Sequence, residues 1–284
     1  MLNPNVETFL GCDCGYEEAD AVLFGAPFDS TTSYRPGARF ASRVMRAESY
    51  GLETYSPYLD RDLTDIRVFD SGDLELCFGD TEQALSDIEA RATAILEDGK
   101  LPVMIGGEHL VTLGAVRAAF AKYPDLHVIH FDAHTDLRDD YLGAKLSHAA
   151  VIRRVWELLG DGRIYQFGIR SGDRSEFQWA KEGHTALQPF DFEGLAQTLE
   201  NLADKPIYFT LDLDVLDPSI FPGTGTPEAG GVGFLDLLRA VRQVCKGRVV
   251  ACDVNELSPH YDQSGVSTAV ACKVLRELLL SLRL

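Results

Sequence analysis

The sequence predicts an α/β protein, with a single domain of three α/β/α layers around a mostly parallel sheet. Short apolar runs rich in Val, Ile, Phe and Leu alternate with longer segments of helical period, which is the pattern of βα units. A chain of 284 residues with 45% hydrophobic and 25% charged residues is ordinary for one such domain. No repeat, low-complexity tract or linker divides the chain, so we expect one domain over residues 1–284.

Seven strands and six helices are expected in alternation. The strands are apolar runs: AVLFG at 21–25, IRVF at 66–69, LPVMI at 101–105, LHVIHFD at 126–132, RIYQFG at 163–168, PIYFTLD at 206–212 and VVACDVN at 248–254. The helices are expected at 81–98, 110–121, 146–159, 192–203, 233–246 and 265–282. Ligands of open α/β sheets bind beyond the carboxyl ends of the strands, so functional residues should directly follow strands.

Composition excludes several classes of protein. With 26 Lys and Arg against 44 Asp and Glu, the net charge is −18, which argues against a nucleic-acid partner. No apolar stretch reaches the roughly 18 residues of a membrane span. The first twenty residues lack the apolar run of a secretory signal, and the six cysteines lack paired metal-binding spacing. We therefore expect a reduced, cytoplasmic protein that binds neither nucleic acid nor membrane.

The strand at 126–132 ends in Asp132-Ala-His134-Thr-Asp136. Residues two apart in an extended chain point to the same side, so these three metal-binding side chains project together. The strand at 206–212 ends likewise in Asp212-Leu-Asp214. These are five candidate metal ligands, and a third strand end, described next, supplies the sixth.

The strand at 101–105 runs into GGEH at 106–109, where paired glycines permit a tight turn that can present His109. Four aspartates packed together would repel one another, and two divalent ions would cancel their charge. The ligands are carboxylates and two imidazoles without a thiolate, which favours Mn(II) over Zn, Co, Fe or Ni. Two such ions can share a hydroxide and direct it at an electrophilic carbon. The sequence therefore predicts a binuclear metal site.

These motifs, in this order and spacing, resemble the arginase/agmatinase family of ureohydrolases, most closely bacterial and archaeal agmatinases. The resemblance covers nearly the whole chain, from GAPFD at 25–29 and RPG at 35–37 through GGEH, DAHTD and LDLDVLDP to DVNE at 253–256. It implies an arginase-like fold and hydrolysis of agmatine to putrescine and urea, with a metal-bridging hydroxide as nucleophile. It also implies a homotrimer or homohexamer.

The resemblance also implies a ligand set for two Mn(II) ions. One ion would be bound by His109, Asp132, Asp136 and Asp212, and the other by His134, Asp132, Asp212 and Asp214. Asp132 and Asp212 would bridge the two ions.

Two further residues match the family. Glu256 would receive the substrate guanidinium in a two-point, charge-assisted contact. His148, twelve residues after Asp136, would be the proton shuttle to the leaving amine, since the pKa of histidine lies near working pH. Asp136 and His148 would pass the proton together.

The segment 137–145 is expected to contact the tail of the substrate. Its adjacent Asp139 and Asp140 suit an ammonium, which favours agmatine or a longer aminopropylagmatine. Arg138 and Lys145 could instead receive a carboxylate, as in guanidinobutyrate or formiminoglutamate, although we expect both to be solvated surface charges. The acidic protein would also attract a cationic guanidine.

Several alternatives stay open from the sequence. Other members of the family, namely an aminopropylagmatine ureohydrolase, guanidinobutyrase, arginase or formiminoglutamase, would carry similar motifs. A non-catalytic, ligand-binding member and a single-metal zinc deacetylase of related fold are alternatives from other classes. His130 should support the site or the core, whereas the roles of His260 and of Glu228, in the 223–228 loop that resembles the family's loop over the site, stay open.

Overall fold

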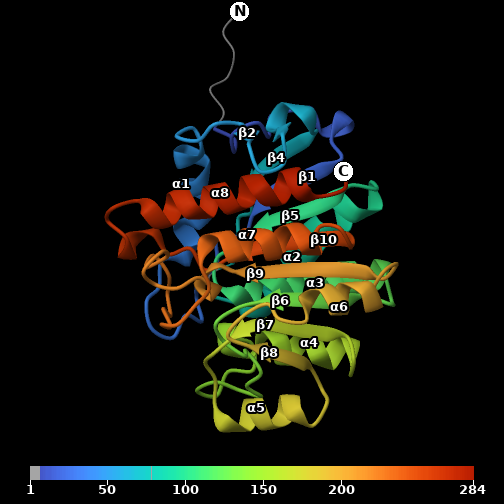
Figure 1. The fold of residues 1–284 in the computed structure, drawn as a ribbon, viewed down its shortest axis with the longest axis vertical. Coiled ribbons are helices and arrows are strands. Elements are labelled where there is room, and N and C mark those ends of the chain that lie inside the picture. The colour runs from blue at the N-terminus through green and yellow to red at the C-terminus, as the bar shows by residue number, and fades with distance from the viewer. Residues whose placement is uncertain (1–6, 78) are drawn as a thin grey trace, which may run out of the picture.

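The computed structural model describes residues 7–77 and 79–284. Within them, a sheet of eight strands in the order β4-β1-β5-β10-β9-β6-β7-β8 forms the centre of the molecule, and all its neighbouring strands run parallel (Figure 1). The strands are β1 (Ala21–Gly25), β4 (Val68–Asp73), β5 (Leu101–Ile105), β6 (His127–Phe131), β7 (Ile164–Ile169), β8 (Ala186–Pro189), β9 (Pro206–Asp212) and β10 (Arg248–Asn255). A two-stranded hairpin of β2 (Tyr55–Ser56) and β3 (Arg61–Asp62) is separate. The inner strands are apolar because helices cover both their faces; every residue of β9, for example, is buried.

Helices form the other two layers. On one face lie α2 (Thr81–Glu97), α3 (Thr112–Lys122) and α4 (Val151–Leu159). On the other face lie α1 (Ala41–Ser49), α6 (Leu195–Asn201), α7 (Phe234–Val244) and α8 (Val266–Ser281), the last two in front of the sheet in Figure 1. Helix α5 (Arg174–Lys181) lies beside the β8 edge. No helix in the described ranges is both long enough and apolar enough to cross a membrane.

The predicted three-layer fold with a mostly parallel sheet is confirmed. The seven expected strands agree with the observed ones within a few residues, but the sequence analysis missed β8, α1, α5 and the small hairpin. Strand β8 reads ALQP and is largely half-buried at the sheet edge, so it lacks the apolar run that marks an inner strand. Helix α5 has eight residues and is largely polar, so it too lacks the apolar pattern that predicts a buried element.

The expected helix at 146–159 begins later than predicted. Ser147 is extended, with φ −149° and ψ 160°, and His148–Ala150 form a single 3-10 turn. The backbone N–H of His148 donates to Thr31 Oγ1 over 3.1 Å, so a distant segment holds this part of the chain. Helix α4 therefore starts at Val151, and His148 lies just before it.

Candidate metal centre

Three strand ends at one edge of the sheet carry the predicted metal ligands. His109 follows β5, Asp132 directly follows β6, and Asp212 is the last residue of β9. In the sheet, β10 and β9 lie between β5 and β6, so these ends belong to the four central strands. Because the strands are parallel, their carboxyl ends meet at the same edge, where α/β proteins place their sites.

The two glycines before His109 are needed for close approach rather than for a turn. The chain does bend after β5, at residues 107–108, but the bend needs no left-handed glycine, because residues with positive φ include neither Gly106 nor Gly107. A Cβ on Gly106 would lie 1.7 Å from Asn255 Oδ1, and one on Gly107 would lie 1.9 Å from the carbonyl oxygen of Phe28. Only glycine lets these neighbouring segments meet behind the site.

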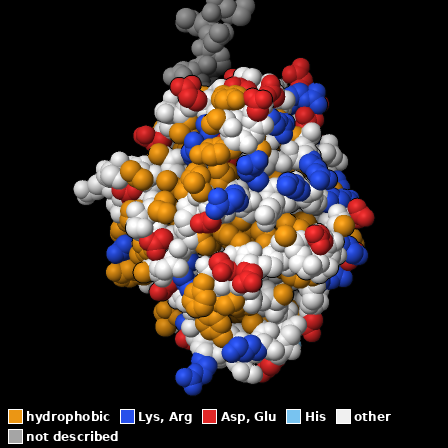
Figure 2. Space-filling view, viewed as in Figure 1, with side chains coloured by type: hydrophobic (Ala, Val, Ile, Leu, Met, Phe, Trp, Pro, Cys, Tyr) orange, Lys and Arg blue, Asp and Glu red, His pale blue; other side chains and the backbone are white. Residues whose placement is uncertain are grey.

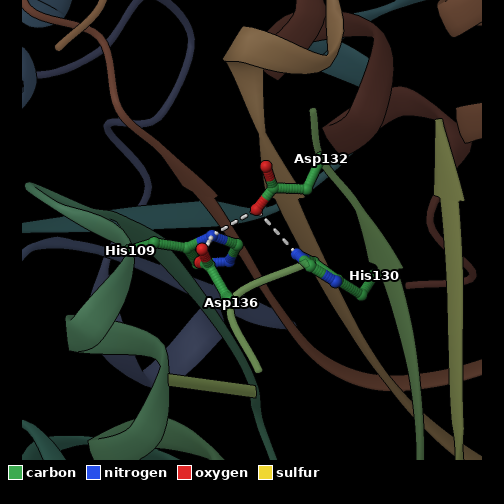
Figure 3. A group of neighbouring side chains, drawn as sticks. All are labelled: His109, His130, Asp132 and Asp136. Carbon is green, nitrogen blue, oxygen red and sulfur yellow. Dashed lines mark hydrogen bonds and ion pairs between the residues drawn. The ribbon is translucent and has the colours of Figure 1, made fainter. Parts of the chain in front are cut away.

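A first group of ligand atoms surrounds His109. Its Nδ1 lies 2.9 Å from Asp132 Oδ2, 3.3 Å from Asp136 Oδ2 and 3.2 Å from Asp212 Oδ2. All four side chains are buried. Figure 3 shows His109, from the segment after β5, close to Asp132 and Asp136, both from the segment after β6.

A second group surrounds His134. Its Nδ1 lies 3.0 Å from Asp214 Oδ2 and 3.4 Å from Asp132 Oδ1. The two oxygens of Asp132 thus face the two groups, one oxygen each, which is the position that a bridging carboxylate requires. Asp212 joins the groups in another way, because its Oδ2 faces His109 while its Oδ1 accepts the backbone N–H of Asp214 at 2.8 Å.

His130 supports Asp132 from the interior of the sheet. Its Nε2 lies 2.8 Å from Asp132 Oδ2, and its Nδ1 accepts a hydrogen bond from Gln166 Nε2 at 3.1 Å. Since Nδ1 accepts, the proton sits on Nε2 and is donated to the carboxylate. This is the supporting role that the sequence analysis expected of His130, and Gln166 is a partner that the sequence did not indicate.

The other face of His109 is fixed by a hydrogen-bond chain that sequence reasoning missed. Thr210 donates its hydroxyl proton to Asp253 Oδ1 at 2.6 Å, so its oxygen accepts from His109 Nε2 at 2.8 Å. In its neutral form His109 therefore keeps its proton on Nε2 and presents the Nδ1 lone pair, the atom that a metal ion would use, toward three carboxylate oxygens. Asp253 was visible in the DVNE motif, but nothing in the sequence connects it with His109.

The electrostatics of the cluster follow from burial and crowding. Burial and the neighbouring Asp132 raise the pKa of Asp136 to about 7. Burial, together with Asp214 and Asp132, raises the pKa of Asp212 well above its usual value. Burial also raises the pKa of Asp132, but hydrogen bonds from histidines, His109 first, outweigh it and hold that pKa well below its usual range. The cluster therefore retains protons unless another cation replaces them.

These side chains fit divalent metal ions. In the described part of the chain, the ion pairs of Asp132, Asp136, Asp212 and Asp214 involve only histidines, with no Lys or Arg. One proton on His109 Nδ1 cannot satisfy three carboxylate oxygens at once, so a divalent cation that replaces it suits the space between them. Four carboxylates and two imidazoles, all hard or borderline ligands, are suited to such ions.

A cavity of about 270 Å³ opens onto the second group of ligands. It is lined by Ser33, His134, Thr135, Asp136, Arg138, Tyr141, His148, Ala149, Ser171, Gly172, Asp173, Glu176 and Thr226. Among these residues Arg138 is the single Lys or Arg, and its Nη1 lies 2.5 Å from Asp173 Oδ2. The cavity therefore presents carboxylates and no unpaired guanidinium or ammonium group.

His148 lies in the wall of this cavity, outside both groups of ligands. Its Nε2 is 3.0 Å from Ser33 Oγ, and the ring of Tyr141 packs edge-on against it. Burial and the nearby His134 lower the pKa of His148 to about 4. This pKa lies below the value near working pH that the sequence analysis assumed, so the imidazole is neutral at neutral pH and would have to accept a proton before passing it on. Its role as the proton shuttle stays a prediction.

Glu256 lies behind His109 and is 4% exposed. Its Oε1 accepts the backbone N–H of His109 at 2.7 Å, and its own backbone has φ +67°. Burial, followed by the charge of Glu108, raises the pKa of Glu256 well above its usual value. Gly225 lies beside its other oxygen, so the 223–228 loop covers this carboxylate. Contact of Glu256 with a guanidinium stays a prediction.

The structure places Asp139 and Asp140 apart from the cavity of His134. Asp139 Oδ1 accepts from Arg154 at 3.0 Å, and Asp140 Oδ1 accepts the backbone N–H of Gly143 at 3.1 Å. Both line a neighbouring cavity of about 280 Å³, which shares Arg138, Asp173 and Glu176 with the first. Their predicted contact with a substrate ammonium stays untested, and it requires a tail that extends past Arg138.

The structure shows the contacts of His260 and Glu228, whose roles the sequence left open. The ring of His260 lies 4.8 Å from that of Phe40, away from the ligand groups. The backbone carbonyl of Glu228 accepts from Arg170 Nη2 at 2.8 Å, and Arg170 Nη2 also donates to the carbonyl of Asp214 at 2.7 Å. Arg170 thus ties the 223–228 loop to the Asp214 segment through the backbone of Glu228.

Comparisons with known proteins agree with this geometry. The Arginase family profile matches residues 19–281. The agmatinase of Bacillus subtilis is 48% identical over 277 residues, which is 96% of each chain. A crystal structure from Clostridium difficile superposes with a TM-score of 0.92 at 53% identity, covering 94% of this chain and 98% of that one. The agmatine ureohydrolase of Thermoplasma volcanium superposes with a TM-score of 0.89 at 37% identity, covering 98% and 94%.

Proposed function

The chain belongs to the arginase family, and from this premise we propose that it hydrolyses the guanidino group of agmatine to putrescine and urea. It is a hydrolase of guanidino groups, as its relatives are. Agmatine is supported by the relatives named agmatinase, which cover 96% of the chain. The observation that carries the proposal is the meeting of His109 Nδ1 with three carboxylate oxygens within 3.3 Å at the carboxyl edge of the sheet.

Two Mn(II) ions are the proposed cofactor. His109, Asp132, Asp136 and Asp212 would hold one ion, and His134, Asp132, Asp212 and Asp214 would hold the other. When bound, the ions would lower the pKa of water so that it becomes the nucleophile at neutral pH, as metal pairs do in hydrolases. Manganese is favoured by a ligand set that is rich in carboxylates and free of thiolates.

The side chains would orient the substrate and move its protons. Glu256 would receive the planar guanidinium in a charge-assisted contact and hold the guanidinium carbon toward the two groups of metal ligands. Hydrolysis adds one water to the guanidinium carbon and breaks the bond to the alkyl nitrogen, which must gain a proton before it leaves as an amine. Asp136 would accept a proton from the water, and His148 would deliver one to that nitrogen.

The cavity favours a substrate with a cationic tail. Asp136, Asp173 and Glu176 line it, and Arg138, its single Lys or Arg, is already paired with Asp173. The α-carboxylate of arginine would enter this cavity without a free cationic partner, whereas the ammonium of agmatine would enter a wall where carboxylates outnumber cations. This contrast supports agmatine, or a longer agmatine-like amine, over arginine and guanidinobutyrate.

We further propose that the protein forms a homotrimer or homohexamer and that it is cytoplasmic. Figure 2 shows hydrophobic side chains gathered over the face that α7 and α8 cover. On these helices Leu235 is 52% exposed and Val266 is 49% exposed. Such apolar surface suits contact between subunits. Light scattering would measure the subunit number, and a monomer at micromolar concentration would contradict it.

The test of function is urea release by the purified protein after loading with Mn(II). We expect urea and putrescine from agmatine in equal amounts, and neither product from the Asp132→Asn variant. Circular dichroism of that variant would confirm that it is folded. If the folded, metal-loaded protein releases no urea from any guanidine in a panel, the proposed function is wrong and the non-catalytic alternative gains support.

A further inference from the structure

We propose that Glu108 is a positioning residue that holds His148 at the cavity wall through the hydroxyl of Thr31. The inference rests on the proposed function, because it assumes that His148 transfers a proton. Glu108 is next to His109 in the chain, yet its carboxylate contacts a different segment, residues 31–32. It would act on the reaction only through the placement of another side chain.

The carboxylate of Glu108 is wholly committed to this segment. Glu108 is 0% exposed. Its Oε2 accepts the backbone N–H of Thr31 at 2.9 Å and the hydroxyl of Thr32 at 3.1 Å, while its Oε1 accepts the hydroxyl of Thr31. A buried carboxylate needs such hydrogen-bond donors to offset its lost hydration, so the position of Glu108 determines the position of residues 31–32.

The backbone holds the same two segments together. The N–H of Glu108 donates to the carbonyl of Phe28 at 2.8 Å. Gly107 makes this approach possible, since a Cβ there would lie 1.9 Å from that carbonyl oxygen. The segment that follows β1 is therefore anchored directly behind the metal ligands.

Thr31 relays this position to His148. Its hydroxyl gives its proton to Glu108, which leaves its oxygen to accept the backbone N–H of His148 at 3.1 Å. Two residues further on, Ser33 Oγ lies 3.0 Å from His148 Nε2. One anchored segment thus contacts both the backbone and the ring of His148.

His148 needs such an external anchor because no regular helix holds it. It follows an extended Ser147 and precedes α4, in a single 3-10 turn. Proton transfer requires the imidazole to lie within hydrogen-bond reach of the leaving nitrogen, and a displacement of about 1 Å can cost roughly 10² in rate. The contacts of Thr31 and Ser33 supply the missing constraint.

Thr31 and Thr32 offer a matched pair of variants. Both hydroxyls donate to Glu108, but only that of Thr31 also contacts His148. We expect Thr31→Val to lower kcat for agmatine roughly tenfold with KM and bound Mn(II) unchanged. Thr32→Val should change kcat by less than about twofold. Equal losses in the two variants, or an unchanged kcat in Thr31→Val, would overturn the inference.

A double-mutant cycle separates positioning from general stability. If Thr31 acts through His148, then Thr31→Val in the His148→Ala background should lower kcat by no more than about twofold, since the effects of coupled residues do not add. A full tenfold loss in that background would overturn the inference while leaving the proposed function intact. If His148→Ala alone leaves kcat unchanged, the assumed role of His148 is wrong and this inference fails with it.

Glu108→Gln tests the carboxylate itself. Glutamine keeps the shape of the side chain but replaces one oxygen with an NH₂ group, so it cannot accept both the Thr31 hydroxyl at the Oε1 position and the Thr32 hydroxyl at the Oε2 position. We expect kcat to fall with little change in KM, and Glu108→Gln to add little to Thr31→Val. Additive losses in the folded, metal-loaded double variant would contradict the proposed relay.

Discussion

His109 is held in place by Thr210, whose hydroxyl oxygen lies 2.8 Å from His109 Nε2. Because that hydroxyl donates to Asp253, it accepts from Nε2 and keeps a proton there, so Nδ1, which faces Asp132, Asp136 and Asp212, is the ring atom left to bind a metal ion. The geometry of the metal site therefore depends on a threonine and an aspartate that would not themselves bind metal.

Replacing Thr210 with Val should weaken metal binding without removing any ligand. We expect an affinity loss of about 10–100-fold, the range for partners of metal-binding histidines. Titration of the metal-free protein with Mn(II) would measure it. The matched control is Thr224→Val, since the Thr224 hydroxyl is buried and has no hydrogen-bond partner in the described structure. Equal affinities for Thr210→Val and wild type would contradict the proposed anchoring.

Replacing His148 with Asn should affect catalysis but not the metal. His148 lies outside both ligand groups, and the expected loss in kcat is about 10² to 10⁴, the contribution of general acid–base catalysis. Steady-state kinetics and metal analysis of the same preparation would test both halves of this prediction. A variant that has lost its metal would show that His148 is a ligand.

Chelation should lower the melting temperature. The ions bind only the folded protein, and a ligand at 10³ times its Kd stabilises by about 4 kcal/mol. For a chain of this size a loss of that order lowers Tm by roughly 7 °C. Calorimetry of verified metal-free and reloaded protein would measure the shift. An unchanged Tm would mean that Asp132, Asp136, Asp212 and Asp214 do not share a cation.

Agmatine should be preferred over arginine. The reactive guanidinium is common to both substrates, so the metal ligands and Glu256 cannot distinguish them. Asp173 and Glu176 in the cavity wall outnumber the single guanidinium of Arg138, which is already paired with Asp173, so this wall carries a net negative charge. An unpaired buried carboxylate costs several kcal/mol, which corresponds to about 10² or more in kcat/KM. If arginine were turned over as well as agmatine, Arg138 or Lys145 would be its partner.

The features that were predicted correctly are those that depend on short-range patterns of apolar and polar residues. The apolar runs located all the inner strands, and the rule that ligands follow strand ends brought His109, Asp132 and Asp212 to one edge. The same approach failed for β8, because a half-buried edge strand carries polar residues. It also extended the helix of α4 back over His148, since nothing local shows that Thr31 captures the backbone of His148.

What the sequence could not predict depends on register between distant segments. Thr210 and Asp253 lie on adjacent strands at paired positions, and only that pairing joins their side chains beneath His109. Gly107 looks like a turn glycine in the sequence, yet its requirement comes from Phe28, which lies far away in the chain. The residues that support the metal ligands are therefore brought together only by the tertiary structure, whereas the ligands themselves can be recognised from short sequence motifs.

The measurement that tests the account most directly is urea release from agmatine during titration of the metal-free protein with Mn(II). Six ligands from three strand ends exceed what one octahedral ion needs once its bound water is counted, so we expect activity to reach its plateau at two ions per chain. The Asp132→Asn variant should bind fewer ions and release no urea. Full activity at one ion per chain would contradict the binuclear site.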